Sequence, residues 1–319
     1  MKTICFVLSV FLLLGFKVHA QALDHESVER AIQSGVKYLN GHQRTSGSWQ
    51  CMGSEEWTTA LVLLALLKSG MPVDDPVIQK GFSYLEKHQP DSTYAVSLLI
   101  MALEAGHDVP GNDSVKLPEK TKKWMQVCVN WLLEAWKHEY WGYKISDDKG
   151  DLSNTQFAVL ALRSASRCGI RVPEKLWHRL LLLLLSRQQN DGPRIEIIGG
   201  KAQEEEYAYY YGQGYRARGW GYQQNGVPRG SMTAAGTACV LIARSELNEN
   251  PKLTPKLREL SEKAINDGMA WLAFHFMVER HPSQGGTHKD WLYYYLYTVE
   301  RVGSRSEEHT SELQSRQSI

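Results

Sequence analysis

Residues 151–162 read DLSNTQFAVLAL, a short polar stretch that runs directly into an apolar helical pattern. The same change recurs in WTTALVLLALLKSG from residue 57, STYAVSLLIMALEAG from residue 92 and SMTAAGTACVLIARSE from residue 231. These segments are apolar nearly all round in their first turns, which is typical of helices enclosed by other helices. The repeated start predicts a helical repeat protein.

A second kind of helical segment alternates with the first and carries more Lys, Arg and Glu. Its copies span residues 28–40, 77–88, 124–136 and 173–187, and a fifth pair of helices is expected at 265–278 and 291–303. Pro173 in a first turn, and Gly70 and Gly106 after helix ends, are start and stop signals. No segment shows period-two alternation, so little β-structure is expected. The pattern predicts an all-α fold of five hairpins, with the apolar helices in an inner ring and the charged ones outside.

Both ends of the chain differ from this repeat region. Residues 1–20 combine Lys2, an apolar run and the sequence Val-His-Ala, which predicts a secretory signal peptide cleaved after Ala20. Residues 304–319 resemble a translated sequencing adapter, so we interpret them as an artefact that follows a truncated gene. The repeat domain is therefore predicted to span residues 21–303, in a secreted or periplasmic protein.

The charge and hydropathy of the repeat domain limit the classes of partner that we expect. The chain has a net charge of +1, and removing both ends leaves a neutral domain. Neutrality argues against nucleic acid or anionic membrane surfaces as partners. No run of 18 apolar residues follows the signal, so no transmembrane segment is expected in the mature chain.

Four cysteines remain in the domain, namely Cys51, Cys128, Cys168 and Cys239. They are widely spaced and no CxxC occurs, which argues against zinc. The last three lie in apolar helical patterns, so we interpret them as core residues. Disulfides stay possible in an oxidising compartment, but we predict no metal and no cofactor.

The first outer helix leads into a stretch that resembles a known repeat. Residues 35–49, GVKYLNGHQRTSGSW, are similar to the QW repeat of the squalene and oxidosqualene cyclases and of protein prenyltransferase β subunits. Degenerate copies lie at 81–89 and 185–192. The resemblance covers residues 21–303 and implies an α/α toroid of six hairpins, of which five are present. A similar group is the uncharacterised secreted proteins with prenyltransferase and squalene-oxidase repeats.

The repeat also has a physical explanation. The Gln43 amide can satisfy backbone groups at a neighbouring helix end. Gly47 permits a tight loop, and Trp49 covers the joint with an apolar face. We therefore interpret these three residues as staples between hairpins.

The resemblance implies an acid at the start of one inner helix, where the cyclases carry DxDDT. Asp151 matches the first Asp, but Ser153 falls on the proton donor and Asn154 on the third Asp. A hydroxyl of ordinary acidity cannot protonate an alkene or epoxide at useful rates. The same residues predict a capping box, in which Ser153 and Gln156 bond each other's backbone amides while Asp151 lies near the helix N-terminus.

The motifs of other protein families with this fold are also incomplete in this sequence. The prenyltransferase zinc motif resembles the stretch from Asp290, but Tyr293 stands where a histidine is needed, and His275, His281 and His288 do not share a helical face. The thioester sequence C-x-E-Q of complement-like proteins does not occur. Acidic residues at 147–148, 151 and 204–206 could serve a carbohydrate-active enzyme, although no spacing pairs them.

A long loop before the fourth inner helix contains EYAYYYGQGYRARGWGYQQNGVPRG at 206–230. Aromatic and guanidinium groups of this kind suit sugars, peptides or flat apolar ligands. The alternative is a loop that plugs the end of the toroid.

We thus predict binding or scaffolding through a central cavity and this aromatic loop. An enzyme of the terpenoid-cyclase type with unknown chemistry is the alternative, and a carbohydrate-active toroid is the third candidate. The candidate binding residues are Asp151, Asn154, Tyr210, Arg218, Trp220, Tyr222, His288 and Asp290.

Overall fold

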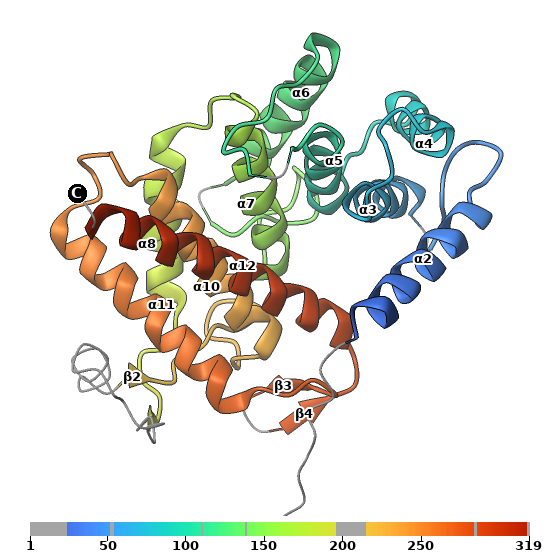
Figure 1. Ribbon diagram of the computed structural model, residues 1–319. Coiled ribbons are helices and arrows are strands. Elements are labelled where there is room, and N and C mark those ends of the chain that lie inside the picture. Colours follow the sequence, from blue (N-terminus) through green and yellow to red (C-terminus); the bar gives the residue numbers. More distant parts are fainter. Residues whose placement is uncertain are drawn as a thin grey trace, which may run out of the picture. The chain divides into compact units, whose positions relative to one another are not determined.

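The computed structural model describes residues 24–51, 54–109, 111–137, 139–195, 215–283 and 286–317, without the side chains of His288 and residues 305–317 (Figure 1). These ranges contain ten helices and four very short strands. The helices are α2 (His25–Gly41), α3 (Glu55–Lys68), α4 (Pro76–Lys87), α5 (Thr93–Ala105), α6 (Glu119–Ala135), α7 (Leu152–Arg167), α8 (Glu174–Arg187), α10 (Gly230–Glu246), α11 (Pro255–His275) and α12 (Leu292–Gln317). The predominantly helical fold is therefore confirmed.

The chain divides into two compact units, Met1–Gln43 and Arg44–Ile319. In the first unit, α2 begins after Asp24, whose carboxylate accepts a hydrogen bond from the Glu26 amide. Gln43 is the last residue of this unit, and its backbone N–H donates a hydrogen bond to the backbone carbonyl of Asn40. The stapling role of the Gln43 side chain stays a prediction.

Five helices of the second unit form one row, in which α3, α5, α7, α10 and α12 each pack against the next (Figure 1). The remaining helices form an outer layer, with α4 on α3, α6 on α5 and α7, and both α8 and α11 on α10. Burial follows this division for α7 and α8, since 13 of the 16 residues of α7 are buried but only five of the 14 in α8. The division into enclosed and outer helices for the rest, the toroid and the number of hairpins stay predictions.

The packing of α4 differs from the expected pairing, which joined each outer helix to the inner helix that follows it. Instead, α4 lies against α3, the inner helix that precedes it. Gly81 explains this contact, because a Cβ there would lie 2.7 Å from Leu63 of α3. A residue without a side chain lets the two helices approach closely.

Tryptophans close the joints at the starts of three inner helices. The amides of Trp49, Trp141 and Trp220 donate to the Oγ1 atoms of Thr59, Thr155 and Thr233 at 3.0, 3.0 and 3.2 Å. The indole N–H groups of Trp141 and Trp220 donate to the carbonyls of Leu132 and Leu184 in outer helices, both at 2.9 Å. Each tryptophan thus joins an outer helix or loop to an inner helix, which is the predicted stapling role.

Gly47 makes the turn before the first of these tryptophans. Its φ is 93°, and a Cβ there would lie 2.4 Å from the Lys80 carbonyl oxygen. The turn therefore needs glycine for both its conformation and its contact. Glutamines contribute similarly in the fourth repeat, where Gln188 Nε2 donates to the carbonyl of Ala264 in α11 at 2.9 Å.

Two antiparallel strand pairs complete the second unit. Strands β1 (Arg194–Ile195) and β2 (Tyr215–Arg216) pair with each other, as do β3 (His281–Ser283) and β4 (Gly286–His288). Strands of two or three residues carry no usable periodicity, so the sequence could not predict them.

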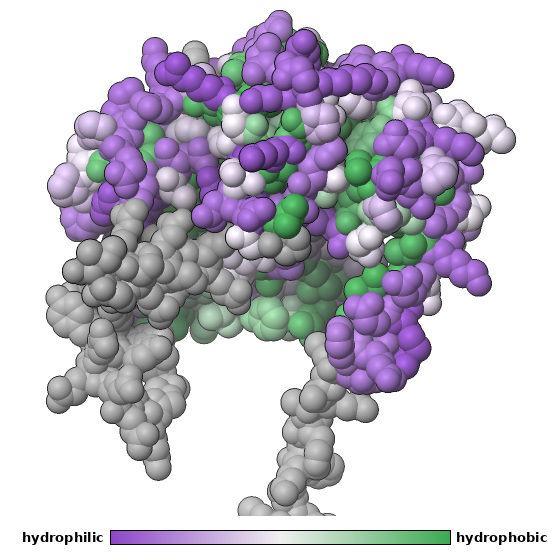
Figure 2. Space-filling model, turned by 45° about the horizontal axis from the view of Figure 1, so that its top comes forward, coloured by the Kyte–Doolittle hydropathy of each residue, from purple (hydrophilic) through white to green (hydrophobic). Residues whose placement is uncertain are grey.

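The last helix, α12, continues to Gln317 and so passes through the segment interpreted as an adapter-derived tail. The domain boundary at residue 303 stays a prediction. In the ranges given above, no helix combines the length and apolar character needed to cross a membrane. Hydrophilic residues predominate on the face in Figure 2, and hydrophobic residues gather toward its lower edge.

Candidate functional site at the start of α7

Two loops converge on the N-terminal end of α7. The amide and Oγ1 of Thr93, at the start of α5, donate to the carbonyls of Tyr143 and Gly142 at 2.9 and 2.6 Å. The amide of Leu152, at the start of α7, donates to the carbonyl of Tyr222 at 3.0 Å. These backbone bonds bring the Tyr143 and Tyr222 loops to one end of the inner row.

Asp151 is the N-cap of α7 and is 4% exposed. Its Oδ1 accepts hydrogen bonds from the Asn154 amide at 2.9 Å and from Ser153 Oγ at 2.5 Å. Its Oδ2 accepts a third from Asn154 Nδ2 at 2.8 Å. The helix therefore begins two residues earlier than a Ser153 cap would require.

The predicted capping box of Ser153 and Gln156 is consequently wrong. Ser153 lies inside the helix and donates its proton to Asp151. Both residue types are good caps, and Asp151 takes the role because the first turn begins at Leu152, where the Asn154 amide reaches its carboxylate. Gln156 instead faces α12, where its Oε1 accepts a hydrogen bond from the Tyr294 hydroxyl at 2.9 Å.

Aromatic rings from three inner helices and one loop gather beside Asp151. Phe157 of α7 has its ring centroid 4.6 Å from that of Tyr94 in α5, and 6.3 and 5.9 Å from those of Tyr294 and Tyr297 in α12. Tyr94 stacks at 5.8 Å on Tyr143. We name these five residues the α7 aromatic cluster.

The α7 aromatic cluster extends from the core to the solvent. Phe157 is 6% exposed, whereas Tyr143 is 50% exposed. The Tyr143 hydroxyl lies 3.2 Å from that of the half-buried Tyr222. A ligand could therefore reach ring faces and hydroxyl groups at the Tyr143 and Tyr222 side.

Two polar atoms at this site are buried and have no hydrogen-bond partner in the described part of the chain. They are Asn154 Oδ1 and Gln156 Nε2. Buried polar groups in proteins are nearly always hydrogen-bonded, so such atoms are typical of ligand sites or ordered water.

Three tyrosine hydroxyls at this site have raised pKa values. Burial raises the pKa of Tyr94, Tyr222 and Tyr294, and the negative charge of Asp151 raises each further. For Tyr222 the Tyr143 hydroxyl also contributes to the higher pKa. The site thus combines neutral hydroxyl groups, ring faces and one carboxylate.

The structure brings together only some of the predicted binding residues. Asp151, Asn154 and Tyr222 meet at the start of α7. Tyr210 lies outside the described residues, as does the side chain of His288, whose backbone belongs to β4. Asp290 is exposed between β4 and α12.

Two predicted binding residues of the aromatic loop serve the fold instead. Trp220 is fully buried against Gly236 of α10. Arg218 Nε pairs with Asp267 Oδ2 of α11 at 2.6 Å. These contacts use both side chains in packing, and a binding role for them stays a prediction.

The sequence missed the α7 aromatic cluster. The available signal was an aromatic residue in the first two turns of three inner helices, but convergence of the rings depends on how these helices pack. Among the described residues, no group of three His, Cys, Asp or Glu side chains could hold a metal ion. Cys128, Cys168 and Cys239 are free and buried, whereas Cys51 is free and exposed.

No protein-family model matches the chain, and no curated protein shows significant similarity to it. The likeness to the cyclases and prenyltransferases therefore rests on the residues of the repeat itself.

Proposed function

We propose that this chain is a secreted helical repeat protein of the prenyltransferase and squalene-oxidase repeat type, which binds a ligand at the α7 aromatic cluster. The observation that carries this proposal is the meeting of five rings, a buried carboxylate and two unpartnered polar atoms at one place. Apolar walls with a few polar groups are typical of small-molecule binding sites.

The hydrogen bonds of Asp151 favour binding over cyclase chemistry. Ser153 stands where the resemblance would place the proton donor, and its hydroxyl donates to Asp151. The one carboxylate at the site accepts three hydrogen bonds from the first turn of its own helix. These contacts support a capping and electrostatic role for Asp151.

A second candidate is an enzyme of the same repeat type with a different reaction. The grouping of Asp151 with the Tyr94, Tyr222 and Tyr294 hydroxyls favours it, because such groups can exchange protons with a ligand. Conversion of a bound ligand, followed by mass spectrometry, distinguishes this candidate from a binding protein.

A ligand panel tests the proposed binding site. The mature chain would be mixed with choline, a neutral alcohol, a disaccharide, a hydrophobic peptide and an isoprenoid diphosphate, and its thermal unfolding recorded. A ligand that binds the folded state raises the unfolding temperature. We expect at least one ligand to do so.

Phe157→Leu should abolish that ligand effect, because the central ring of the cluster is lost while the side-chain volume changes little. Phe82→Leu is the matched control, since Phe82 is a buried phenylalanine of the outer helix α4. Loss of the ligand effect in both variants, or in neither, would contradict binding at the α7 aromatic cluster.

Secretion is a separate part of the proposal. N-terminal sequencing of the protein recovered from a secreting host should give Gln21 as the first residue. Retention of residues 1–20 would contradict the predicted signal peptide.

A further inference from the structure

Asp151 carries a charge that no described cation neutralises at close range. Its hydrogen bonds come from neutral groups of Ser153, Asn154 and Tyr222, and the ion pairs of the described residues do not include it. The helix N-terminus compensates such a charge only in part. Buried carboxylates in proteins are normally paired with a cation or a metal.

The rings next to Asp151 present further negative potential. The face of a phenyl or phenol ring is electronegative and attracts cations within about 6 Å of its centroid. One cation already uses the cluster, since Arg301 Cζ lies 5.6 Å from the centroid of the Tyr297 ring. The ring faces of this cluster are therefore able to hold a positive charge.

Asn154 adds an independent observation. The residue is fully buried, and its Nδ2 holds Asp151 Oδ2. Its Oδ1, on the same amide group, is a buried acceptor with no hydrogen-bond partner in the described residues. At the rim, Lys144 is already paired with Asp91 at 2.6 Å, so it does not neutralise Asp151.

We infer that the α7 aromatic cluster binds a small organic cation of the quaternary ammonium type, with Asp151 as the counter-charge. This inference rests on the proposed binding function of the same site. A neutral sugar could donate hydroxyl hydrogen bonds to the carboxylate but would bring no opposite charge to it. An isoprenoid diphosphate would be repelled by the carboxylate.

Choline and 3,3-dimethylbutan-1-ol provide the sharpest test, because they have nearly the same shape and differ in the charge of the central atom. Both would be titrated into the full chain by calorimetry. We expect choline to bind at least about tenfold more tightly than the neutral alcohol, as one desolvated cation–π contact implies. Equal affinities would overturn the inference.

Asp151→Asn removes the negative charge but keeps the N-cap, because asparagine is an equally good N-cap residue. The variant therefore tests the effect of the charge alone. This variant should lose about tenfold in choline affinity while its affinity for the neutral alcohol stays the same. Asp75→Asn is the matched control, since Asp75 caps α4 through the Val77 amide at 2.8 Å. Unchanged choline affinity in Asp151→Asn would also overturn the inference.

The panel of ligands separates failure of this inference from failure of the proposed function. If choline does not bind but another ligand stabilises the chain in a Phe157-dependent way, the cation assignment is wrong and the binding site stands. If no ligand acts in a Phe157-dependent way, the proposed function itself fails, and the cation assignment fails with it.

Discussion

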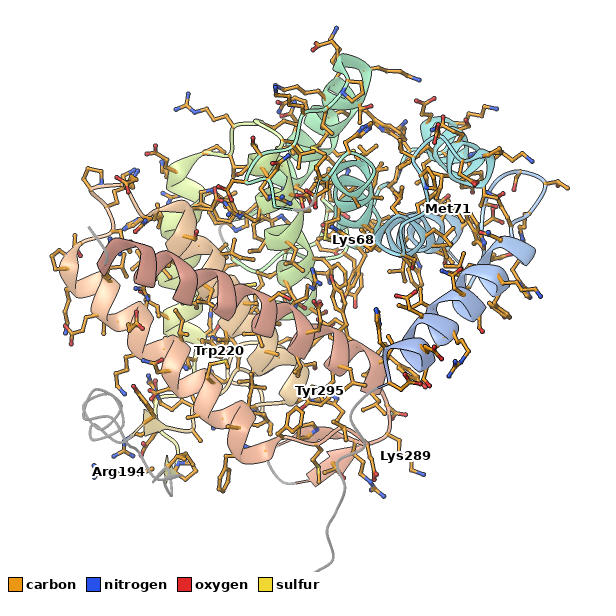
Figure 3. The ribbon with its side chains drawn as sticks, viewed as in Figure 1. Lys68, Met71, Arg194, Trp220, Lys289 and Tyr295 are labelled. Atoms are coloured by element: carbon orange, nitrogen blue, oxygen red, sulfur yellow. The ribbon has the colours of Figure 1, made fainter. Side chains whose placement is uncertain are left out.

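The starts of α7 and α10 occupy equivalent places in the repeat but satisfy their backbone amides differently. At α7 the cap is Asp151, the residue directly before the helix. At α10 the residue before the helix is Arg229, which makes no side-chain cap, and the Ser231 amide donates instead to Nε2 of His281 at 3.1 Å. His281 belongs to strand β3, and its ring stacks on the ring of Tyr295 in α12. Figure 3 shows Tyr295 close to β3.

This difference separates a structural joint from a candidate binding site. The imidazole at α10 accepts the Ser231 amide and fastens the β3–β4 hairpin to the helix. The carboxylate at α7 lies beside the α7 aromatic cluster, in which Tyr143 is 50% exposed. Both helix starts therefore have a capped backbone amide. At α10 the capping contact only joins two parts of the fold, whereas at α7 the capping residue also lies at the proposed ligand-binding site.

Trp220→Ala should affect both helix starts and have the largest effect. The Trp220 carbonyl accepts the Arg229 amide next to α10, and two residues later the Tyr222 carbonyl accepts the Leu152 amide of α7. We expect the free energy of unfolding to fall by about 3–5 kcal/mol, as for other buried aromatic truncations. Chemical denaturation measures this, with Trp291→Ala as control because Trp291 is 68% exposed.

His281→Ala should weaken only the α10 start. Removal of the acceptor leaves a buried amide unsatisfied, which destabilises by about 1–3 kcal/mol. Ligand binding at the α7 aromatic cluster should be unchanged. A comparable loss of binding would show that the two helix starts are not independent.

Asp151→Ala should destabilise by about 1 kcal/mol, the usual effect of losing an N-cap. Asp151→Asn should change the free energy of unfolding by only a few tenths of a kcal/mol, since asparagine caps equally well. Thermal and chemical unfolding of the two variants together check that the cap, rather than the charge, stabilises α7.

Ser153→Ala should have the smallest effect. It removes one hydrogen bond to Asp151 but leaves the cap, so we expect a loss of about 0.5–1 kcal/mol. If Ser153→Ala destabilises more than Asp151→Ala, the hydrogen bonds described for the α7 start are wrong.

The sequence predicted the helices because long apolar periodicity is a local property. It did not predict the cap of α7, since Asp151 and Ser153 are both good cap residues and their competition depends on where the first turn begins. Trp220 and Arg218 looked like ligand contacts because an aromatic and basic loop has the same composition whether it folds inward or outward. The α7 aromatic cluster requires α5, α7 and α12 to be packed side by side, which no single segment encodes.

Hydrogen–deuterium exchange at the two helix starts is the most direct test of the proposed binding site. The exchange of the chain would be compared with and without the most stabilising ligand of the panel. We predict slower exchange in the first turn of α7 and around Tyr222, with no change at the first turn of α10. Protection at the α10 start alone, or unchanged exchange at α7 under saturating ligand, would contradict binding at the α7 aromatic cluster.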